Sequence, residues 1–355
     1  MAFWPNCVLL PSSVGADRSL CMPPFAPLAV DLPLVMTVGE PAGVGPEIAV
    51  KARAELGDAL PFCLISDPAH LPAGTRFARV ASPAEVRGLP GDVLPVIPHE
   101  FPAPAYPGRP EPANAPAVID AIARAVALVQ AGMASGLVTG PIHKQVLTEG
   151  AGFAYPGHTE YLAALAGVDR VVMMLASPLL RVVPATIHIP LAEVPAALTP
   201  DLLETTLRLT EAGLSRDFGL AAPRIAVAGL NPHAGEGGTI GGEELRVIRP
   251  VLERLRAEGM QLHGPMPADT MFHPAARAGY DAAVCMYHDQ ALIPIKTLDF
   301  AGGVNVTLGL PFVRTSPDHG TAFDIAGQGR ADPTSLIAAL RLAAELAARR
   351  ALAPA

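Results

Sequence analysis

Three histidines occupy the same kind of position in this sequence, at or just after the end of a short apolar run. His188 lies in ATIHIPL, His233 in AVAGLNPHAGEGG and His288 in AVCMYHDQAL. Side chains that follow the carboxyl ends of parallel strands meet at one edge of a sheet. Three imidazoles around an open fourth position are a typical catalytic zinc set. The pattern favours a divalent-metal centre over its alternative, three loop histidines that are satisfied by ordinary hydrogen bonds.

A second group of residues has the chemistry of an anion site. His158 and Thr159 begin a predicted helix in YPGHTEYLA, where free backbone N–H groups favour anions. Lys296 follows the last histidine motif, Asn305 lies in GVNVTLGL, and Arg314 follows that run among turn residues. Charge-assisted hydrogen bonds from such a set hold a phosphate or a carboxylate. As solvated surface charges, the same residues would bind nothing.

Short apolar runs that alternate with helical segments must position these residues. Strands are predicted at 32–39, 61–67, 136–141, 170–176, 224–231, 281–289 and 303–310. Helices are predicted at 114–133, 200–214, 243–259 and 333–350, and Thr199 is a good N-cap for the second. This alternation indicates an α/β fold with a largely parallel sheet.

Two glycine-rich segments interrupt the pattern. GLNPHAGEGGTIGGEE (229–244) is either a tight loop that presents His233 or a phosphate cradle, and it has neither the Walker nor the Rossmann spacing. GEPAGVGPE (39–47) turns the first strand into a helix near Pro46.

Composition excludes several classes of protein. Half of the 355 residues are apolar and 16% are charged, unlike a disordered chain. The net charge of −8 and the lack of a basic patch argue against a nucleic-acid partner. Apolar stretches are broken well before about 18 residues, so no membrane span is expected. Four cysteines without CxxC spacing fit a reducing, cytoplasmic setting. Residues 1–31, rich in Pro, Ser and Cys, are predicted to be a disordered extension.

The motifs together resemble the 4-hydroxythreonine-4-phosphate dehydrogenase family of vitamin B6 biosynthesis. The resemblance runs from about Val35 to the last predicted helix, and it is carried by GEPAGVGPE, TGPIHK, YPGHTEYL, ATIHIPL, GLNPHAGEGG, GPMPADTMF, MYHDQALIPIK and GVNVTLGLPFVRTSPDHGTAFDIAGQG. Ala291 stands after HDQ, where glycine is frequent in the family, and the LIPIKTLDFAGG loop also departs from some members. These departures affect the shape of a loop and leave the ligand positions intact.

The resemblance implies a fold like that of isocitrate and isopropylmalate dehydrogenases, with two α/β domains around a central cleft. Residues 32–155 plus 305–355 would form the NAD-binding domain, and residues 156–304 the metal, substrate and dimer domain. The family's metal ligands fall on His188, His233 and His288, for one divalent ion (Zn, Mg or Co) per site. Its substrate contacts fall on His158, Thr159, Lys296, Asn305 and Arg314. The family also implies a homodimer with the active site at the subunit interface.

DHGTAFDIAG (318–327) is similar to the adenosine-binding loop of isopropylmalate dehydrogenases. The similarity places His319, Gly320, Thr321 and Asp324 at the cofactor. A carboxylate at Asp324 would accept from both ribose hydroxyls and repel a 2′-phosphate, which favours NAD over NADP. The alternative is that Asp324 only interacts favourably with the dipole at the start of a helix.

The implied reaction is oxidation of the C3 alcohol of 4-phosphooxy-L-threonine, followed by decarboxylation to 3-amino-2-oxopropyl phosphate. Lys296 would bind the phosphate or carry a proton, and Asp269 and Asp289 would orient metal-bound histidines. Sister dehydrogenases acting on D-threonate or D-erythronate 4-phosphate, or on an aromatic dihydrodiol carboxylate, fit the same motifs. A metal-dependent lyase or hydrolase that does not use NAD, and a non-catalytic binding module, are the alternatives from other classes.

Overall fold

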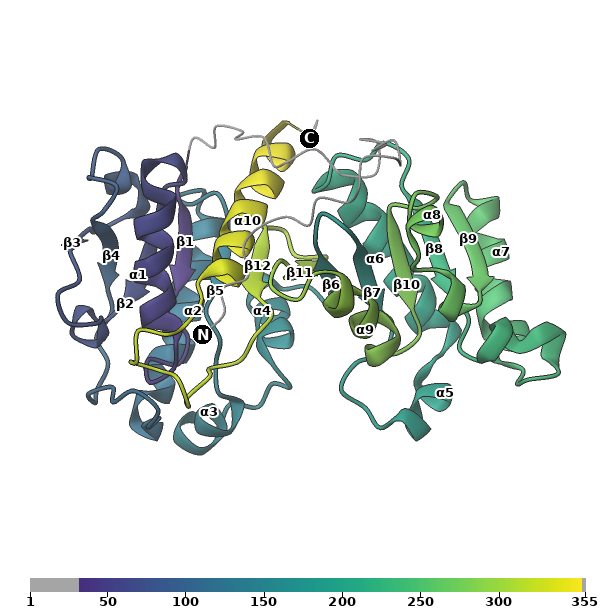
Figure 1. Ribbon diagram of the computed structural model, residues 1–355, viewed down its shortest axis with the longest axis horizontal. Helices are drawn as coiled ribbons and strands as arrows, with labels where there is room; N and C mark the ends of the chain where they lie inside the picture. Colours follow the sequence, from purple (N-terminus) through teal and green to yellow (C-terminus); the bar gives the residue numbers. More distant parts are fainter. Residues whose placement is uncertain (1–31, 353–355) are drawn as a thin grey trace, which may run out of the picture.

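The computed structural model describes residues 32–352, which form an α/β fold built on one twelve-stranded sheet (Figure 1). The extension predicted for residues 1–31 lies outside the described residues. The strand order is β3-β4-β2-β1-β5-β12-β11-β6-β7-β10-β8-β9. The strands are β1 Leu34–Thr37, β2 Phe62–Ser66, β3 Phe77–Arg79, β4 Leu94–Pro98, β5 Leu137–Thr139, β6 Val172–Ala176, β7 Arg181–Pro184, β8 Arg224–Ala228, β9 Gln261–Met266, β10 Ala282–Cys285, β11 Val304–Leu308 and β12 Arg314–Pro317.

Helices cover the two faces of the sheet, and the C-terminal helix lies over its middle (Figure 1). They are α1 Gly45–Leu56, α2 Ala115–Gln130, α3 Lys144–Ala151, α4 His158–Ala166, α5 Val194–Ala197, α6 Pro200–Arg216, α7 Arg249–Ala257, α8 Pro274–Arg277, α9 His288–Leu298 and α10 Thr334–Leu352. Most strand pairs are parallel. Strand β11 runs antiparallel to both β12 and β6, so it joins the two halves of the sheet.

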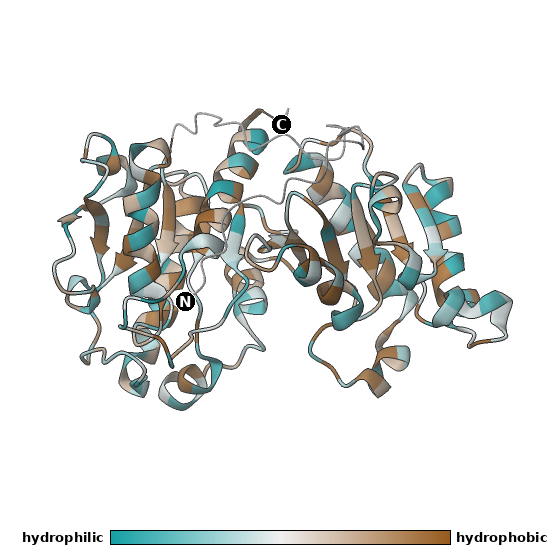
Figure 2. Ribbon diagram, viewed as in Figure 1, coloured by the Kyte–Doolittle hydropathy of each residue, from teal (hydrophilic) through white to brown (hydrophobic). Residues whose placement is uncertain are grey.

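Burial on both faces explains why the strands read as continuous apolar runs. Every residue of β1 (LVMT) and of β2 (FCLIS) is buried, and Figure 2 shows the strands as mainly hydrophobic ribbons between amphipathic helices. The seven predicted strands correspond to β1, β2, β5, β6, β8, β10 and β11. Helix α6 begins as predicted, because the Thr199 hydroxyl accepts a hydrogen bond from the backbone N–H of Leu202 at 3.2 Å.

The segment 112–130 passes the length and composition test for a membrane-crossing helix. In this fold, helix α2 packs against β1, β2, β5, α3 and α4, and its Ala117, Val118, Ile122 and Val126 side chains are buried. These contacts are those of a core helix in a layered α/β protein.

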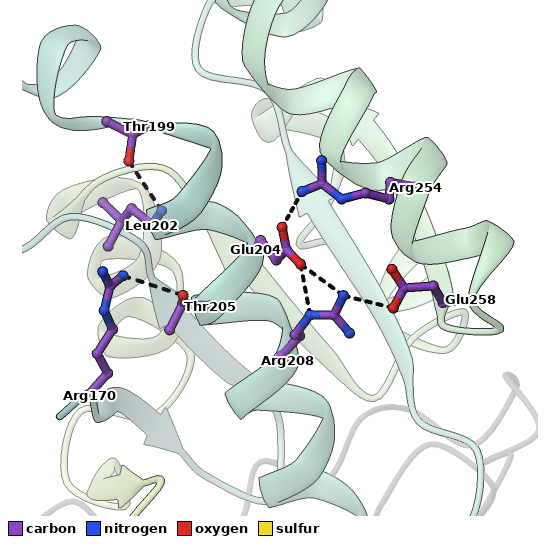
Figure 3. Close-up of polar contacts among 8 residues, drawn as sticks. All are labelled: Arg170, Thr199, Leu202, Glu204, Thr205, Arg208, Arg254 and Glu258. Carbon is purple, nitrogen blue, oxygen red and sulfur yellow. Dashed lines mark hydrogen bonds and ion pairs between the residues drawn. The ribbon is translucent and has the colours of Figure 1, made fainter. Parts of the chain in front are cut away.

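Helices α6 and α7 are joined by a network of surface ion pairs (Figure 3). Glu204 accepts hydrogen bonds from Arg208 and is paired with Arg254 of α7, and Arg208 also pairs with Glu258 at 2.7 Å. Hydrogen bonding to Arg208 lowers the pKa of Glu204. These partly exposed pairs connect the surfaces of α6 and α7.

Two predicted elements differ from the structure. The helix expected over 243–259 starts as a π-helical turn, Glu244–Ile248, before α7. Pro250 lacks an N–H and therefore cannot continue the ordinary hydrogen-bond ladder. Arg314 was expected among turn residues, but it begins strand β12. The sequence RTSP carries no apolar alternation, because its buried side chains are polar; Arg314 contacts threonines of the neighbouring strands and the Thr315 hydroxyl donates to the Ala339 carbonyl in α10.

Candidate functional site

A cavity of about 400 Å³ lies where β5, β11 and β12 meet the start of α4. It is lined by several of the residues predicted to touch substrate, metal or cofactor: His158, Thr159, His188, Asn305, Arg314, His319 and Gly320. Thr139, Glu160, Ser316 and Asp318 also line it. Four of the five anion-site residues, all except Lys296, therefore share one cavity with part of the predicted cofactor loop, although the His158–Thr159 helix start is far in sequence from the other residues.

Arg314 is the buried cation of this cavity, with 3% of its surface exposed. Its Nη2 donates to the Thr139 hydroxyl at 2.6 Å, and its Nη1 donates to the Thr307 hydroxyl at 2.9 Å and to Asn305 at 3.5 Å. Its Nε–H is buried without a partner. Burial lowers the pKa of Arg314 to about 10, which still leaves the group charged at neutral pH. A buried cation with a free donor is suited to bind an anion.

His158 begins helix α4, as predicted, after Gly157 in extended conformation. Its Nε2 is buried and has no hydrogen-bond partner. Burial, and then the positive charge of Arg314, hold the pKa of His158 well below its usual value. The imidazole is therefore neutral, and with the N–H groups of the first turn of α4 it adds polarity to the cavity without adding a second positive charge.

Two of the three predicted metal ligands lie together. The ring centroids of His188 and His288 are 5.8 Å apart. His288 begins α9, and its Nδ1 is hydrogen-bonded to the Asp289 carboxylate at 2.7 Å, which leaves Nε2 free. This arrangement fits a divalent cation, since metal-binding histidines usually donate their second ring nitrogen to a carboxylate. His188 has φ 52°, a left-handed conformation that is strained for a residue with a Cβ.

His233 lies in a separate loop. From His233 to Gly237, five consecutive residues have positive φ, between 42° and 76°. The loop is held by Asn231, whose backbone N–H donates to Glu244 at 2.7 Å and whose side-chain amide donates to Glu243 and Glu244. Within residues 32–352 of one chain, no three His, Cys, Asp or Glu side chains are grouped to hold a metal ion. The described part of one chain thus brings two of the three predicted ligands together, and His233 lies apart from them.

The two predicted orienting aspartates differ in their surroundings. Asp289 contacts His288, as expected for a carboxylate that orients a metal ligand. Asp269 is exposed in the short helical turn Ala268–Thr270, which packs against the His233 loop. Gln290 links the segment that carries His288 to the segment that leads to His233. Its amide nitrogen donates to the Gly229 carbonyl at 2.8 Å, and its oxygen accepts from the Met286 N–H at 2.7 Å.

His288 begins α9 and Lys296 lies in its last turn. Lys296 lines a second hollow together with His288 and Asp289. Its ammonium forms an ion pair with Asp318, which lines the main cavity, and it lies over the Phe300 ring. Lys296 is thus connected to the cavity through Asp318.

The predicted cofactor loop follows β12. His319 and Gly320 line the cavity, and the Nε2 of His319 is buried without a partner. The Thr321 carbonyl accepts from the Val44 N–H at 3.0 Å, so this loop packs against the glycine-rich turn after β1. A side chain at Gly43 would lie 2.8 Å from the Thr321 carbonyl oxygen, which explains the glycine there. Asp324 is exposed, as a carboxylate that accepts from ribose hydroxyls must be. These features fit a dinucleotide, since an unpartnered nitrogen and an open carboxylate remain for a ligand.

Sequence reasoning missed Thr139, Thr307 and Asp318. Thr139 belongs to the TGPIHK motif and Asp318 to the DHGTA string, and these motif positions were the signals that could have found them. Thr307 gives no signal of its own, because threonine is common in strands.

Comparison with known proteins identifies the family of this chain. A family model described as pyridoxal phosphate biosynthetic protein PdxA matches residues 50–343. The 4-hydroxythreonine-4-phosphate dehydrogenase of Paracoccus denitrificans is 66% identical over 322 residues, which are 90% of this chain and 98% of that protein.

Among solved structures, the enzyme of the same name from Klebsiella pneumoniae is 38% identical with a TM-score of 0.82, covering 89% of this chain and 99% of that one. A terephthalate 1,2-cis-dihydrodiol dehydrogenase from Burkholderia xenovorans is 29% identical with a TM-score of 0.61, covering 88% and 98%. Fold and comparisons together define an α/β dehydrogenase. The chain belongs to the PdxA family of pyridoxal phosphate biosynthesis.

Proposed function

We propose that this protein is an NAD-dependent and divalent-metal-dependent dehydrogenase that oxidises and decarboxylates 4-phosphooxy-L-threonine to 3-amino-2-oxopropyl phosphate. The observation that carries the proposal is the buried Arg314, which faces a cavity of about 400 Å³ and has no carboxylate partner within residues 32–352. A substrate with a phosphate supplies the missing anion.

In this proposal, Arg314, Asn305 and the His158–Thr159 helix start bind the phosphate, and Lys296 reaches it by leaving Asp318. The C3 hydrogen leaves as hydride to NAD and the hydroxyl proton is released. The bond from C2 to the carboxylate then breaks, CO₂ leaves and C2 takes a proton. When bound, the divalent cation supplies Lewis acidity at the substrate oxygen. His188 and His288 of one chain hold that cation, and Asp289 fixes the ring of His288.

His233 completes the cation site from a second subunit in this proposal, and the protein is a cytoplasmic homodimer. Three observations support the shared site: the pairing of His188 with His288, the separate position of His233 and the absence of a three-ligand group in the described part of one chain. The loop His319–Asp324 holds NAD.

The test is a spectrophotometric assay of NADH formation from 4-phosphooxy-L-threonine, together with a measurement of CO₂ release. The proposal expects one CO₂ per NADH, loss of both after chelation and recovery on adding Zn²⁺, Mg²⁺ or Co²⁺. Faster turnover of D-threonate or D-erythronate 4-phosphate, or of a dihydrodiol carboxylate, would assign the protein to a sister activity. Turnover without NAD, or no NAD binding in a titration, would contradict the proposal and support a lyase, a hydrolase or a binding module.

A further inference from the structure

Arg314 differs in its partners from Arg53, which is equally buried, and from the partly buried Arg350. Arg350 pairs with Asp217 at 2.8 Å, and Arg53 contacts Asp58 at 3.5 Å in addition to backbone carbonyls. Arg314 contacts only neutral oxygens, from Thr139, Thr307 and Asn305. Three of its five N–H donors are used, and its Nε–H is buried without a partner. An ion pair is therefore missing at the one arginine that faces the cavity.

The pleat of the sheet places the two threonines beside this guanidinium. Strands β5 and β12 are parallel with Leu137 next to Arg314, so Thr139, two residues further on, points to the same face. Strands β11 and β12 are antiparallel with Val306 opposite Thr315, and this register brings Thr307 opposite Arg314. Thr139 is 0% and Thr307 3% exposed, so both hydroxyls are buried and interact with the protein and not with bulk water.

This arrangement is costly for folding and useful for binding. A buried cation without a counter-ion destabilises a folded protein, and a carboxylate in place of either threonine would remove that penalty. The same carboxylate would also neutralise the charge that an incoming anion needs. Two hydroxyls hold the guanidinium in place and leave its charge uncompensated.

We propose that Thr139 and Thr307 are positioning residues for anion binding: they fix Arg314 between β5 and β11 as an uncompensated cation that takes the phosphate of the substrate. The inference rests on the proposed function for the identity of the anion and goes beyond it in assigning these two residues. Neither threonine needs to touch the substrate.

The test measures binding of inorganic phosphate to the full chain by titration calorimetry, for Thr139→Val, Thr307→Val and the matching serine variants. Valine keeps the shape and removes the hydroxyl, so each valine variant should bind phosphate about tenfold more weakly or worse, which is the loss expected when a charged group is misplaced. Each serine variant should stay within about threefold of the wild type, because the hydroxyl is retained.

Thr210→Val is the matched control. Thr210 is also fully buried, and its hydroxyl donates to the Thr206 carbonyl inside α6, away from the cavity. This variant should show a similar change in melting temperature with unchanged phosphate affinity. Thr307→Asp gives the sharpest contrast, since it should keep or raise the melting temperature and abolish measurable phosphate binding.

The outcomes separate the two claims. Wild-type phosphate affinity in both valine variants, or in Thr307→Asp, overturns the positioning role if Arg314→Ala has lost binding. Unchanged affinity in Arg314→Ala instead removes the phosphate site of the proposed function, and the positioning role falls with it. If the valine variants are poorly folded, normal affinity in Thr307→Asp still decides against the positioning role.

Discussion

The ammonium of Lys296 on α9 is paired with the carboxylate of Asp318 in the loop after β12. The pair joins the helix that begins with His288 to the segment that continues into the predicted cofactor loop. Lys296 is 33% and Asp318 20% exposed in their side chains, so water and an incoming anion can both reach the pair. A substrate phosphate that binds Lys296 must compete with Asp318.

The first prediction follows from this competition. Asp318→Asn should strengthen binding of inorganic phosphate by a few-fold, because exposed ion pairs are worth roughly 0–1 kcal/mol. Lys296→Met should weaken it. Titration calorimetry on both variants checks this, and weaker phosphate binding in Asp318→Asn would show that Asp318 orients Lys296 and does not compete for it.

The proposal of a metal site shared between subunits predicts complementation between inactive chains. His188→Ala and His233→Ala should each lack activity and bind Zn²⁺ weakly while keeping the fold. If the two histidines of one site come from different subunits, a mixed dimer has one site with both defects and one intact site. Co-expression with two affinity tags should then restore up to about half of the activity per dimer.

The matched control is the pairing of His188→Ala with His288→Ala, because these two rings lie 5.8 Å apart in the same chain. That mixed dimer should stay inactive, since each of its sites keeps one defect. Purified mixed dimers that are inactive in every pairing would refute a site shared between subunits.

Cofactor choice should depend on Asp324. Replacing this exposed carboxylate in Asp324→Ser removes its repulsion of a 2′-phosphate, and a basic residue introduced nearby adds an attraction. The ratio of kcat/KM with NAD to kcat/KM with NADP should fall. Steady-state kinetics with both cofactors measure the ratio, and an unchanged value would place the ribose contact elsewhere in the loop.

The pH dependence of stability should report on His158. Burial and Arg314 lower its pKa in the folded state, so the unfolded chain binds the proton more readily. Stability from this group is complete above pH 6.5 and is lost as the pH falls below that value. Melting temperatures at pH 7.5 and 5.5 should therefore differ less in His158→Gln than in the wild type.

His70 also has a pKa lowered by burial, so His70→Gln is the control for this comparison. Both variants should flatten the pH dependence, and only His158→Gln should also alter phosphate binding. A wild-type pH dependence in His158→Gln would mean that this imidazole is protonated freely in the folded protein.

The sequence predicted the apolar strands of the sheet better than its polar strands. Runs such as LPLVMTVG and GVNVTLGL identify β1 and β11, because strands covered on both faces are apolar throughout. Strand β12, RTSP, has no such signal, although all four of its residues are buried. Its polar side chains have partners that are distant in sequence, such as Thr139 for Arg314, and local patterns do not reveal such partners.

The candidate site was also predicted only in part. His158, Asn305 and Arg314 were predicted to act together, and they line one cavity. His233 was predicted beside His188 and His288, and the structure of one chain does not bring the three together. The division of the chain into residues 32–155 plus 305–355 and residues 156–304 stays a prediction. Sequence spacing alone does not show which loops meet in three dimensions.

The most direct test of the account is the discrimination between phosphorylated and unphosphorylated substrate by Arg314. Wild-type protein should have a much higher kcat/KM for 4-phosphooxy-L-threonine than for 4-hydroxy-L-threonine. Arg314→Ala should lose roughly 1.5–3 kcal/mol of that preference, because a charge-assisted hydrogen bond to the phosphate is removed. If the variant instead loses kcat/KM equally for both compounds, Arg314 does not bind the phosphate and the central claim is contradicted.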